Sequence, residues 1–275
     1  MHKETLEDIG EKELINRLKK FMPKNQILDD CALIKARNDD ILVNNDSLVE
    51  NIHFTDLTIS AKDLGWKAVV SNISDLLSSG SKKTIGITIS LILPAKTEWF
   101  WVEELYKGIN KALKKYGGKI LGGDCSKGNQ KVISVTAFGI QGELELRRNE
   151  CKPEDVILTT GIHGLSKLGF LIKNNINFDN NISINERLIN KAIERFCRPK
   201  LHPNLIKNLL KTLTNKKIKK IGCTDSSDGL FQALQDLAIS RKCKAIINYE
   251  KIPKYKNWPK GDKCDEYYFF GGEDY

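Results

Sequence analysis

Seven aspartates of this 275-residue sequence stand in short stretches of Gly, Ser, Thr and Asn rather than on the faces of helical patterns. Gathered in one place, these carboxylates would repel one another strongly, so the fold has to supply divalent cations. Oxygen donors of this kind suit Mg²⁺, and carboxylate-bound Mg²⁺ is typical of phosphoryl transfer. The seven are Asp29, Asp30, Asp46, Asp75, Asp124, Asp225 and Asp228.

Phosphoryl transfer between two phosphates has to bring like charges together. At about 4 Å and an effective dielectric constant near 20, two unit charges repel by about 4 kcal/mol, and two dianions by roughly four times that. Because a typical enzyme lowers its barrier by only about 8 to 23 kcal/mol, charge neutralisation is the leading demand. A phosphate acceptor is largely ionised at pH 7 and needs little help from a general base, so the small number of histidines, four, is no objection.

Each acidic motif alone is typical of a turn or a helix cap. Their joint occurrence, at places where strands end or helices begin, favours one shared site. The common nucleotide-binding motifs are absent: the sequence has no G-x-x-x-x-G-K-[ST], no G-x-G-x-x-G after a strand and no protein-kinase signature. A nucleotide would therefore have to be held in a different way.

Helical and strand patterns alternate along the chain. Ser60 and Asp63 resemble a capping box at one helix start, and Thr97 is expected to cap the next helix. We predict helices over residues 11–21, 60–79, 97–113, 165–173, 186–196, 204–213 and 229–240. Strands are predicted over 32–35, 41–43, 84–92, 131–142, 156–160, 218–224 and 244–248.

The length favours two domains, since about 100 to 200 residues per domain are usual. Charged residues and Pro153 interrupt the apolar periodicity near residues 147–155, which places the expected boundary there. Residues 1–147 are expected to form an α+β unit, a sheet with helices on one face, and residues 148–275 an α/β domain. The aromatic run before Gly271 is expected to leave a strand edge, so we expect further residues after Tyr275.

Composition excludes several classes of protein. Hydrophobic residues at 40% and charged residues at 29% are typical of a globular protein without a disorder signature. No apolar run reaches the roughly 18 residues that span a bilayer, and no signal peptide is visible, so we expect a cytoplasmic protein without a membrane partner. The seven widely spaced cysteines indicate reduced thiols. The net charge of +9 is spread along the chain, so no nucleic-acid partner is expected.

Taken together and in order, the motifs resemble the thiamine-monophosphate kinase family of the aminoimidazole-ribonucleotide-synthetase-like superfamily. The resemblance spans nearly the whole chain, and the ordered set is far more specific than any one piece. The motifs are Leu28-Asp29-Asp30-Cys31-Ala32, Asn45-Asp46-Ser47-Leu48-Val49 with His53-Phe54, Asn72-Ile73-Ser74-Asp75, Gly122-Gly123-Asp124, Lys152-Pro153, Asp225-Ser226-Ser227-Asp228-Gly229-Leu230 and Gly271-Gly272-Glu273-Asp274-Tyr275.

The resemblance implies ATP-dependent phosphorylation of thiamine monophosphate to thiamine diphosphate, by direct transfer with several Mg²⁺ ions. It implies a two-domain fold in which residues 1–147, with a mixed sheet, bind ATP and Mg²⁺ and form a homodimer. Residues 148–275 would form the second domain.

The resemblance also assigns roles within the motifs. Asp30, Asp46 and Asp124 would be catalytic, and His53 and Glu273 would face the thiamine substrate. ATP would meet Gly123, Asp124, Arg148 and Ser227. The metal ligands would be Asp30, Asp46, Asp75, Asp124, Asp225 and Asp228, assisted by oxygens of Asn44 and Asn45.

Some positions depart from the family pattern. Leu28 stands where Gly is usual, Asn44 and Asn45 stand where Ser or Thr and Thr are usual, and Lys167 replaces a small residue in a glycine-rich turn. Two alternatives stay open for single residues: His53 as a loop histidine bonded to backbone, and Arg148 as a solvated residue at the domain boundary. Two also stay open for function: a superfamily member acting on another small substrate, or a nucleotide-binding relative with reduced turnover.

Overall fold

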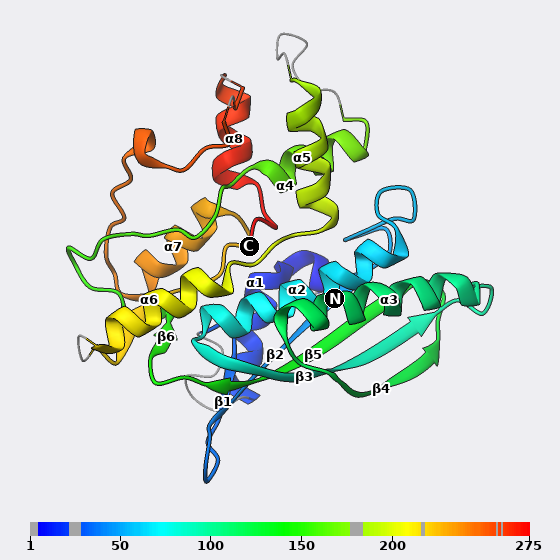
Figure 1. Ribbon diagram of the computed structural model, residues 1–275, viewed down its shortest axis with the longest axis horizontal. Helices are drawn as coiled ribbons and strands as arrows, with labels where there is room; N and C mark the ends of the chain where they lie inside the picture. Colours follow the sequence, from blue (N-terminus) through cyan, green and yellow to red (C-terminus); the bar gives the residue numbers. More distant parts are fainter. Residues whose placement is uncertain (1–4, 22–28, 177–183, 216–217, 257, 260) are drawn as a thin grey trace, which may run out of the picture.

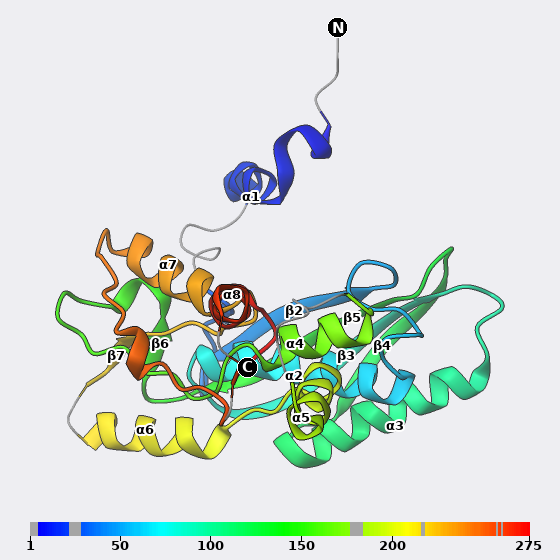
Figure 2. The same ribbon diagram turned by 90° about the horizontal axis from the view of Figure 1, so that it is seen from above.

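The computed structural model describes residues 5–21, 29–176, 184–215, 218–256, 258–259 and 261–275. Leu28 lies outside the described residues. A five-stranded sheet, covered on one face by two long helices, forms the lower part of the molecule in Figure 1. Most of the remaining helices stand above these two, so the second half of the chain lies over the helical side of the sheet (Figures 1 and 2).

The sheet is mixed, which confirms the expected fold class. Its strand order is β1-β2-β5-β3-β4, with β3 and β4 parallel and every other neighbouring pair antiparallel. The strands are β1 (Ala32–Ile34), β2 (Ile41–Val49), β3 (Ser81–Leu93), β4 (Ile120–Lys127) and β5 (Val132–Gln141).

The covering helices are α2 (Ala61–Ser78) and α3 (Trp99–Tyr116). The Ser60 side chain accepts a hydrogen bond from Asp63 N at 3.2 Å, so Ser60 is the N-cap of α2 as predicted, but Asp63 does not return the bond that would complete a capping box. The two helices approach closely because glycines face each other: a Cβ on Gly65 would lie 2.0 Å from Leu105 O, and one on Gly108 would lie 1.8 Å from Lys62 O.

One apolar core lies between this helical layer and the sheet. Val69, Val70 and Leu76 of α2 are fully buried, and so are Val135 and Ile133 of β5. The same core takes in Phe196, Cys197 and Leu201 from the second half of the chain. The two halves therefore pack directly against each other.

The second half is mainly helical. β6 (Glu145–Arg147) pairs in parallel with β7 (Lys220–Gly222). The Cys264 and Tyr268 side chains, one turn apart on the last helix, are buried against neighbouring segments. The helices are α4 (Leu165–Lys173), α5 (Glu186–Cys197), α6 (Pro203–Asn215), α7 (Leu230–Ser240) and α8 (Asp262–Phe270), with short 3₁₀ turns at Arg148–Glu150 and Tyr249–Lys251.

The N-terminal helix α1 (Leu6–Leu18), with a 3₁₀ turn at Lys19–Phe21, stands away from the sheet in Figure 2. It begins five residues before the predicted residue 11, because Thr5 and Asp8 form a capping box. The chain kinks within this helix at Gly10, whose φ is 69°.

Several predicted elements are wrong. Residues 156–160 and 244–248 form no strand, and Val156 is 82% exposed without a sheet partner. The aromatic run before Gly271 belongs to α8 instead of a strand, and β4 was not predicted because Gly122 and Gly123 obscure it. Thr97 does not cap α3: the N-cap is Glu98, without a side-chain capping bond.

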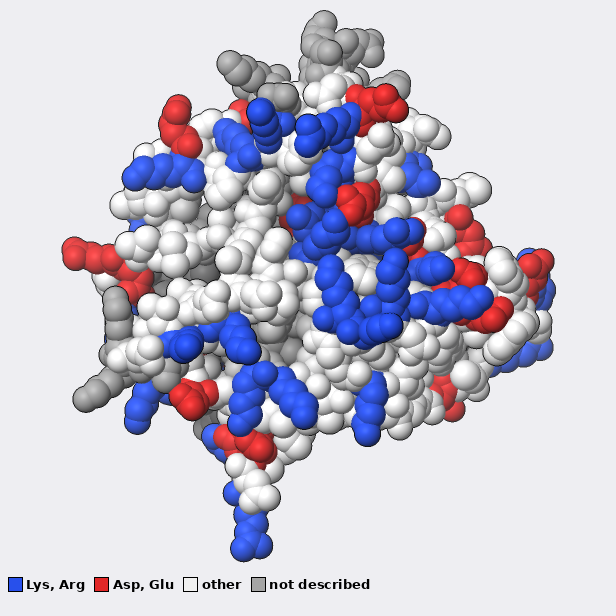
Figure 3. Space-filling view, in the orientation of Figure 1, with Lys and Arg blue, Asp and Glu red and all other residues white. Residues whose placement is uncertain are grey.

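Positively and negatively charged side chains are interspersed on the surface. Figure 3 shows many Lys and Arg side chains on the face in view, with Asp and Glu side chains among them. Arg198 pairs with Asp63 and Lys107 pairs with Glu104, so part of the positive charge is neutralised locally. All seven cysteines lie in the described residues, and none of them forms a disulfide. No helix in the described ranges is long and apolar enough to cross a membrane.

Candidate active site

Strand β2 supplies the first polar groups of the site through its alternation. Asn44 and Asp46 point toward α2, while Asn45 between them points to the other face of the sheet. Asn44 Nδ2 donates to Asp75 Oδ2 at 2.8 Å and to Asn72 Oδ1 at 3.1 Å. Asn45 Nδ2 donates instead to Thr136 Oγ1 at 2.9 Å and to Val135 O at 3.0 Å. The Asn45 side chain is therefore bonded to β5 and does not face Asp75.

Asp30 connects the first half of the chain to the second half. Its carboxylate accepts a hydrogen bond from Ser78 Oγ at 2.8 Å, at the end of α2. It also accepts from the Arg148 guanidinium, and more weakly from Thr224 Oγ1 and Asp225 N, both at 3.4 Å. Segments far apart in the sequence thus meet at one carboxylate.

The carboxylates of this cluster influence one another. Burial, followed by repulsion from Asp225, Asp46 and Asp30, raises the pKa of Asp75 well above its ordinary value. Burial and then Asp30 raise the pKa of Asp225 to about 6, against the lowering effects of Ser227 and Arg148.

Two further carboxylates belong to the same group. Burial and then Asp228 raise the pKa of Asp46, partly offset by His53. Asp228 itself is exposed. The structure therefore brings together Asp30, Asp46, Asp75, Asp225 and Asp228 from four separate segments.

Asp124 and Gly123 lie in another part of the chain. Asp124 is on the edge strand β4, in a cross-strand row with Ser90, Ser134 and Ser47. Three strand spacings of about 4.8 Å separate β4 from β2, or about 14 Å. Asp124 is exposed and accepts a hydrogen bond from Ser126 Oγ at 3.0 Å. A Cβ on Gly123 would lie 1.9 Å from Ile89 O, so glycine there lets β4 pack on β3.

Arg148 is held by several partners at the edge of the cluster. Besides Asp30, its side chain contacts Thr224 Oγ1 at 3.0 Å and Asp236 Oδ2 at 3.4 Å. Burial opposes its ionisation, but Asp30 and Asp236 hold its pKa above the ordinary value. Arg148 is therefore not a merely solvated boundary residue.

His53 and Ser227 flank the cluster. His53 is exposed, and its Nδ1 accepts a hydrogen bond from Val49 N at 3.1 Å, so it makes the backbone contact of a loop histidine while lying near Asp46. Ser227 N donates to Asp225 Oδ2 at 3.3 Å, and Ser227 O accepts from Glu273 N at 2.6 Å. Ser227 thus links the acidic loop to the C-terminal segment.

The C-terminal segment contributes residues to which the sequence reasoning gave no role. Asp274 accepts hydrogen bonds from Gly164 N at 2.6 Å and Ser166 N at 3.1 Å, which caps α4. Burial and then Glu273, Asp225, Asp46 and Asp75 raise the pKa of Tyr275 well above its ordinary value, so this side chain lies beside the acidic cluster. The one sequence feature that pointed to Asp274 and Tyr275 is that both belong to the Gly271–Tyr275 motif.

The donor set fits a hard divalent cation. Within the described ranges, no three His, Cys, Asp or Glu side chains form a ready-made metal-binding group. The cluster nevertheless offers several carboxylates whose pKa values are raised by burial and mutual repulsion. Among the residues that the structure describes, the buried Asn44 Oδ1 has no hydrogen-bond partner. Oxygen donors with excess negative charge are what Mg²⁺ requires.

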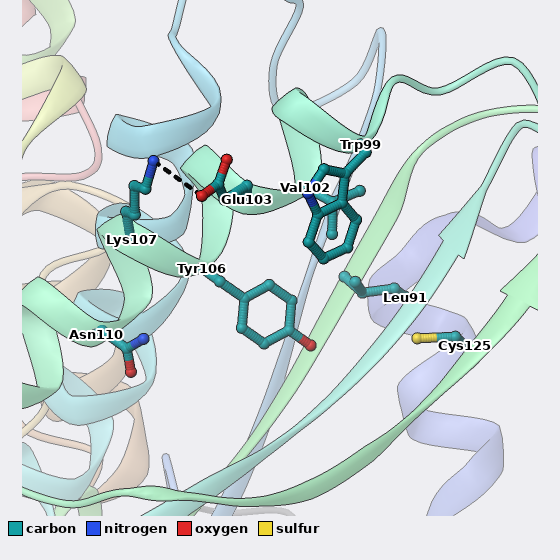
Figure 4. A pocket seen from close by; sticks show the side chains of 8 residues that line it. All are labelled: Leu91, Trp99, Val102, Glu103, Tyr106, Lys107, Asn110 and Cys125. Carbon is teal, nitrogen blue, oxygen red and sulfur yellow. Dashed lines mark ion pairs between the residues drawn. The ribbon is translucent and has the colours of Figure 1, made fainter.

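A separate apolar hollow of about 490 Å³ lies between α3 and β4 (Figure 4). Leu91, Trp99, Val102, Tyr106 and Cys125 line it. Trp99 is 74% exposed at its rim. Cys125 of β4 points into this hollow under α3, so the neighbouring Asp124 side chain points to the opposite face of the sheet.

The mixed sheet covered by two helices is the fold of AIR-synthase-related proteins. The family model described as AIR synthase related protein, N-terminal domain, matches residues 28–141. The thiamine-monophosphate kinase of Prochlorococcus marinus is 41% identical over 99% of this chain and 82% of its own length. That of Synechococcus elongatus is 30% identical over 100% of this chain and 83% of its own length.

A solved structure described as AaThiL complexed with AMPPCP and TMP superposes with a TM-score of 0.84 at 28% identity. The match covers 100% of this chain and 85% of that one. The chain belongs to the thiamine-monophosphate kinase family.

Proposed function

We propose that this protein transfers the terminal phosphoryl group of ATP directly to thiamine monophosphate, forming thiamine diphosphate and ADP. The observation that carries the proposal is the meeting of Asp30, Asp46, Asp75 and Asp225 in one cluster, where burial and like-charge repulsion raise the pKa values of Asp46, Asp75 and Asp225. Family membership supports the choice of substrate, and the AMPPCP and TMP in the related structure support two phosphate-bearing ligands in one protein.

Asp30, Asp46, Asp75, Asp225 and Asp228 would hold several Mg²⁺ ions, with oxygens of Asn44 and Asn45 assisting. When bound, these ions would neutralise the charge of both phosphate groups as they approach. The chain's own task is to hold the carboxylates at fixed places before binding. Ser78, Arg148 and Asn44 support this role, because they fix Asp30 and Asp75 by hydrogen bonds.

Arg148, Ser227, Gly123 and Asp124 would meet ATP. The Arg148 guanidinium, beside the Asp30 carboxylate, suits a phosphate equally well because both anions accept its planar fork of donors. His53 and Glu273 would face the thiamine part of the acceptor. Both lie at the edge of the cluster and are partly or wholly exposed, as substrate contacts must be.

A homodimer through the first-domain sheet is part of the proposal, with Asp124 serving as a catalytic and metal-binding residue within it. The edge strand β4 is exposed along seven of its eight residues, which is a surface that proteins usually cover. The hollow lined by Trp99 and by Cys125 of β4 adds apolar area near the same edge of the sheet. The division into residues 1–147 and 148–275, and a cytoplasmic location, complete the proposal.

Product analysis distinguishes the proposal from its alternatives. The purified chain with Mg²⁺, ATP and thiamine monophosphate should form thiamine diphosphate and ADP in equal amounts, and excess EDTA should stop both. ATP consumption only with a different acceptor would favour another superfamily activity. Nucleotide binding without any product would favour a relative with reduced turnover.

A further inference from the structure

A lysine on α2 that no motif singled out lies deep in the protein. The Lys67 side chain is 2% exposed, and its Nζ lies 2.6 Å from Glu273 Oε2. The same ammonium group lies 4.7 Å from the centre of the Phe196 ring. Lys67 thus joins α2, α5 and the C-terminal segment, and Figure 1 shows the C-terminus directly beside α2.

Stability alone gives little reason to keep a charge at this position. Removing an ammonium group from water is costly, and replacing a buried ion pair by apolar residues of similar size is often neutral or stabilising. The flanking residues of α2, Trp66 and Ala68, are themselves buried apolar residues. The charge of Lys67 is therefore better explained by what it does to Glu273.

Glu273 is held in an unusual conformation. Its φ is 65°, in the left-handed region that non-glycine residues rarely adopt. Such a conformation persists only when the surroundings determine it, and it is common at functional sites. Glu273 N donates to Ser227 O at 2.6 Å, and Ser226 Oγ donates to Asp274 O at 2.6 Å. These bonds fix the backbone, while Lys67 fixes the carboxylate.

We propose that Lys67 is a positioning residue for the substrate thiamine monophosphate. Its ammonium group holds Glu273 Oε2 in place. Glu273 Oε1 is then left to accept a hydrogen bond from an N–H donor of the thiamine group. Within the described residues, Oε1 has no hydrogen bond, and the Glu273 side chain is 33% exposed although its partner is buried. The inference rests on the proposed function, in which Glu273 faces the thiamine substrate.

The test compares Lys67→Met, Lys67→Arg, Glu273→Gln and the double variant Lys67→Met with Glu273→Gln. Lys62→Met is the matched control, because Lys62 lies on the same helix, its side chain is 45% exposed and it pairs with Glu104 at 3.7 Å. Lys67→Met should raise KM for thiamine monophosphate about tenfold or more and leave KM for ATP within about threefold. Lys67→Arg, which keeps the charge, should recover part of the loss, and Lys62→Met should match the wild type.

The double variant separates positioning from mere stabilisation. Glu273→Gln should lower Tm because it leaves the Lys67 charge buried and unpaired, and the double variant should regain that Tm. KM for thiamine monophosphate should stay raised in the double variant. It should not exceed the KM of either single variant, because both changes act through one contact. If the double variant recovers KM together with Tm, or if Lys67→Met leaves KM unchanged, Lys67 is only a structural ion pair and the inference is overturned.

Amide hydrogen exchange keeps this result distinct from a failure of the proposed function. Faster exchange across residues 271–275 in Lys67→Met, and not in Lys62→Met, supports positioning of this segment, and unchanged exchange overturns it. If the wild-type protein forms no thiamine diphosphate, the proposed function is refuted. The proposed contact between the Glu273 carboxylate and thiamine is then refuted with it.

Discussion

Replacing Asp225 by Asn should stabilise the metal-free protein at pH 7.5. Burial and the neighbouring Asp30 raise the pKa of Asp225 from 3.8 to about 6. The folded state therefore binds the Asp225 proton more tightly than the unfolded chain does. It follows that the free energy of unfolding falls as the pH rises from about 4 to about 6, and stays lower above that range.

The difference between about 6 and 3.8 is about 2 pH units, which corresponds to at most about 3 kcal/mol at neutral pH. The Asn variant also loses part of the hydrogen bond from Ser227 N at 3.3 Å and the attraction of Arg148. A net gain of about 1 to 2 kcal/mol, or roughly 2 to 8 °C in Tm, is expected. Mg²⁺ should reverse the order, because a ligand stabilises only the protein that binds it.

Urea unfolding followed by circular dichroism, in EDTA at pH 5 and pH 7.5 and then with Mg²⁺ at pH 7.5, measures these effects. Asp39→Asn is a suitable control, because Asp39 makes an exposed ion pair with Lys82 at 2.7 Å outside the cluster. The control should show no gain specific to pH 7.5. Equal destabilisation of Asp225→Asn at both pH values would refute the argument from like-charge repulsion.

Three further changes test other parts of the structure. Asp124→Ala should abolish turnover and leave Tm unchanged, because Asp124 is exposed with one short-range bond; retained activity in a product assay would remove it from the site. Burial raises the pKa of Asp274 to about 7, so its contribution to stability falls as pH rises from about 4 to about 7. Asp274→Asn should flatten that slope in urea titrations, and an unchanged slope would contradict the assignment. Gly108→Ala should destabilise by about 1 to 3 kcal/mol in the same titrations, because its Cβ would lie 1.8 Å from Lys62 O; a neutral effect would mean that α2 and α3 separate easily.

The order of the motifs in the sequence predicts that the aspartates converge, but it does not predict the local structure around each aspartate. The sequence suggests that Asp46 follows a short strand over 41–43, since Asn and Asp are unfavourable within strands. In the structure, β2 continues through Asn44, Asn45 and Asp46 to Val49, because it pairs with β5 over nine residues. Pairing outweighs local preference there, and the resulting alternation decides that Asn44 faces Asp75 while Asn45 does not.

Long-range contacts explain the remaining differences. β4 contains two glycines that resemble a turn, and only its parallel pairing with β3 makes it a strand. The aromatic residues of α8 have strand-like composition, but Cys264 and Tyr268 bury one helical face. Lys67 gave no motif signal at all, because its partner Glu273 lies in a segment that only the fold brings to α2. The position of Asp124 is likewise fixed by strand order, which periodicity does not encode.

The central claim is that carboxylates from separate segments hold the cations that shield two phosphate groups from each other. Anomalous diffraction from crystals grown with Mn²⁺ in place of Mg²⁺ and a non-hydrolysable ATP analogue tests it most directly. Mn²⁺ peaks should lie among the side-chain oxygens of Asp30, Asp46, Asp75 and Asp225, within about 2.5 Å of them, as for hard cations with carboxylate ligands. A well-ordered nucleotide with no Mn²⁺ at these carboxylates would contradict the claim.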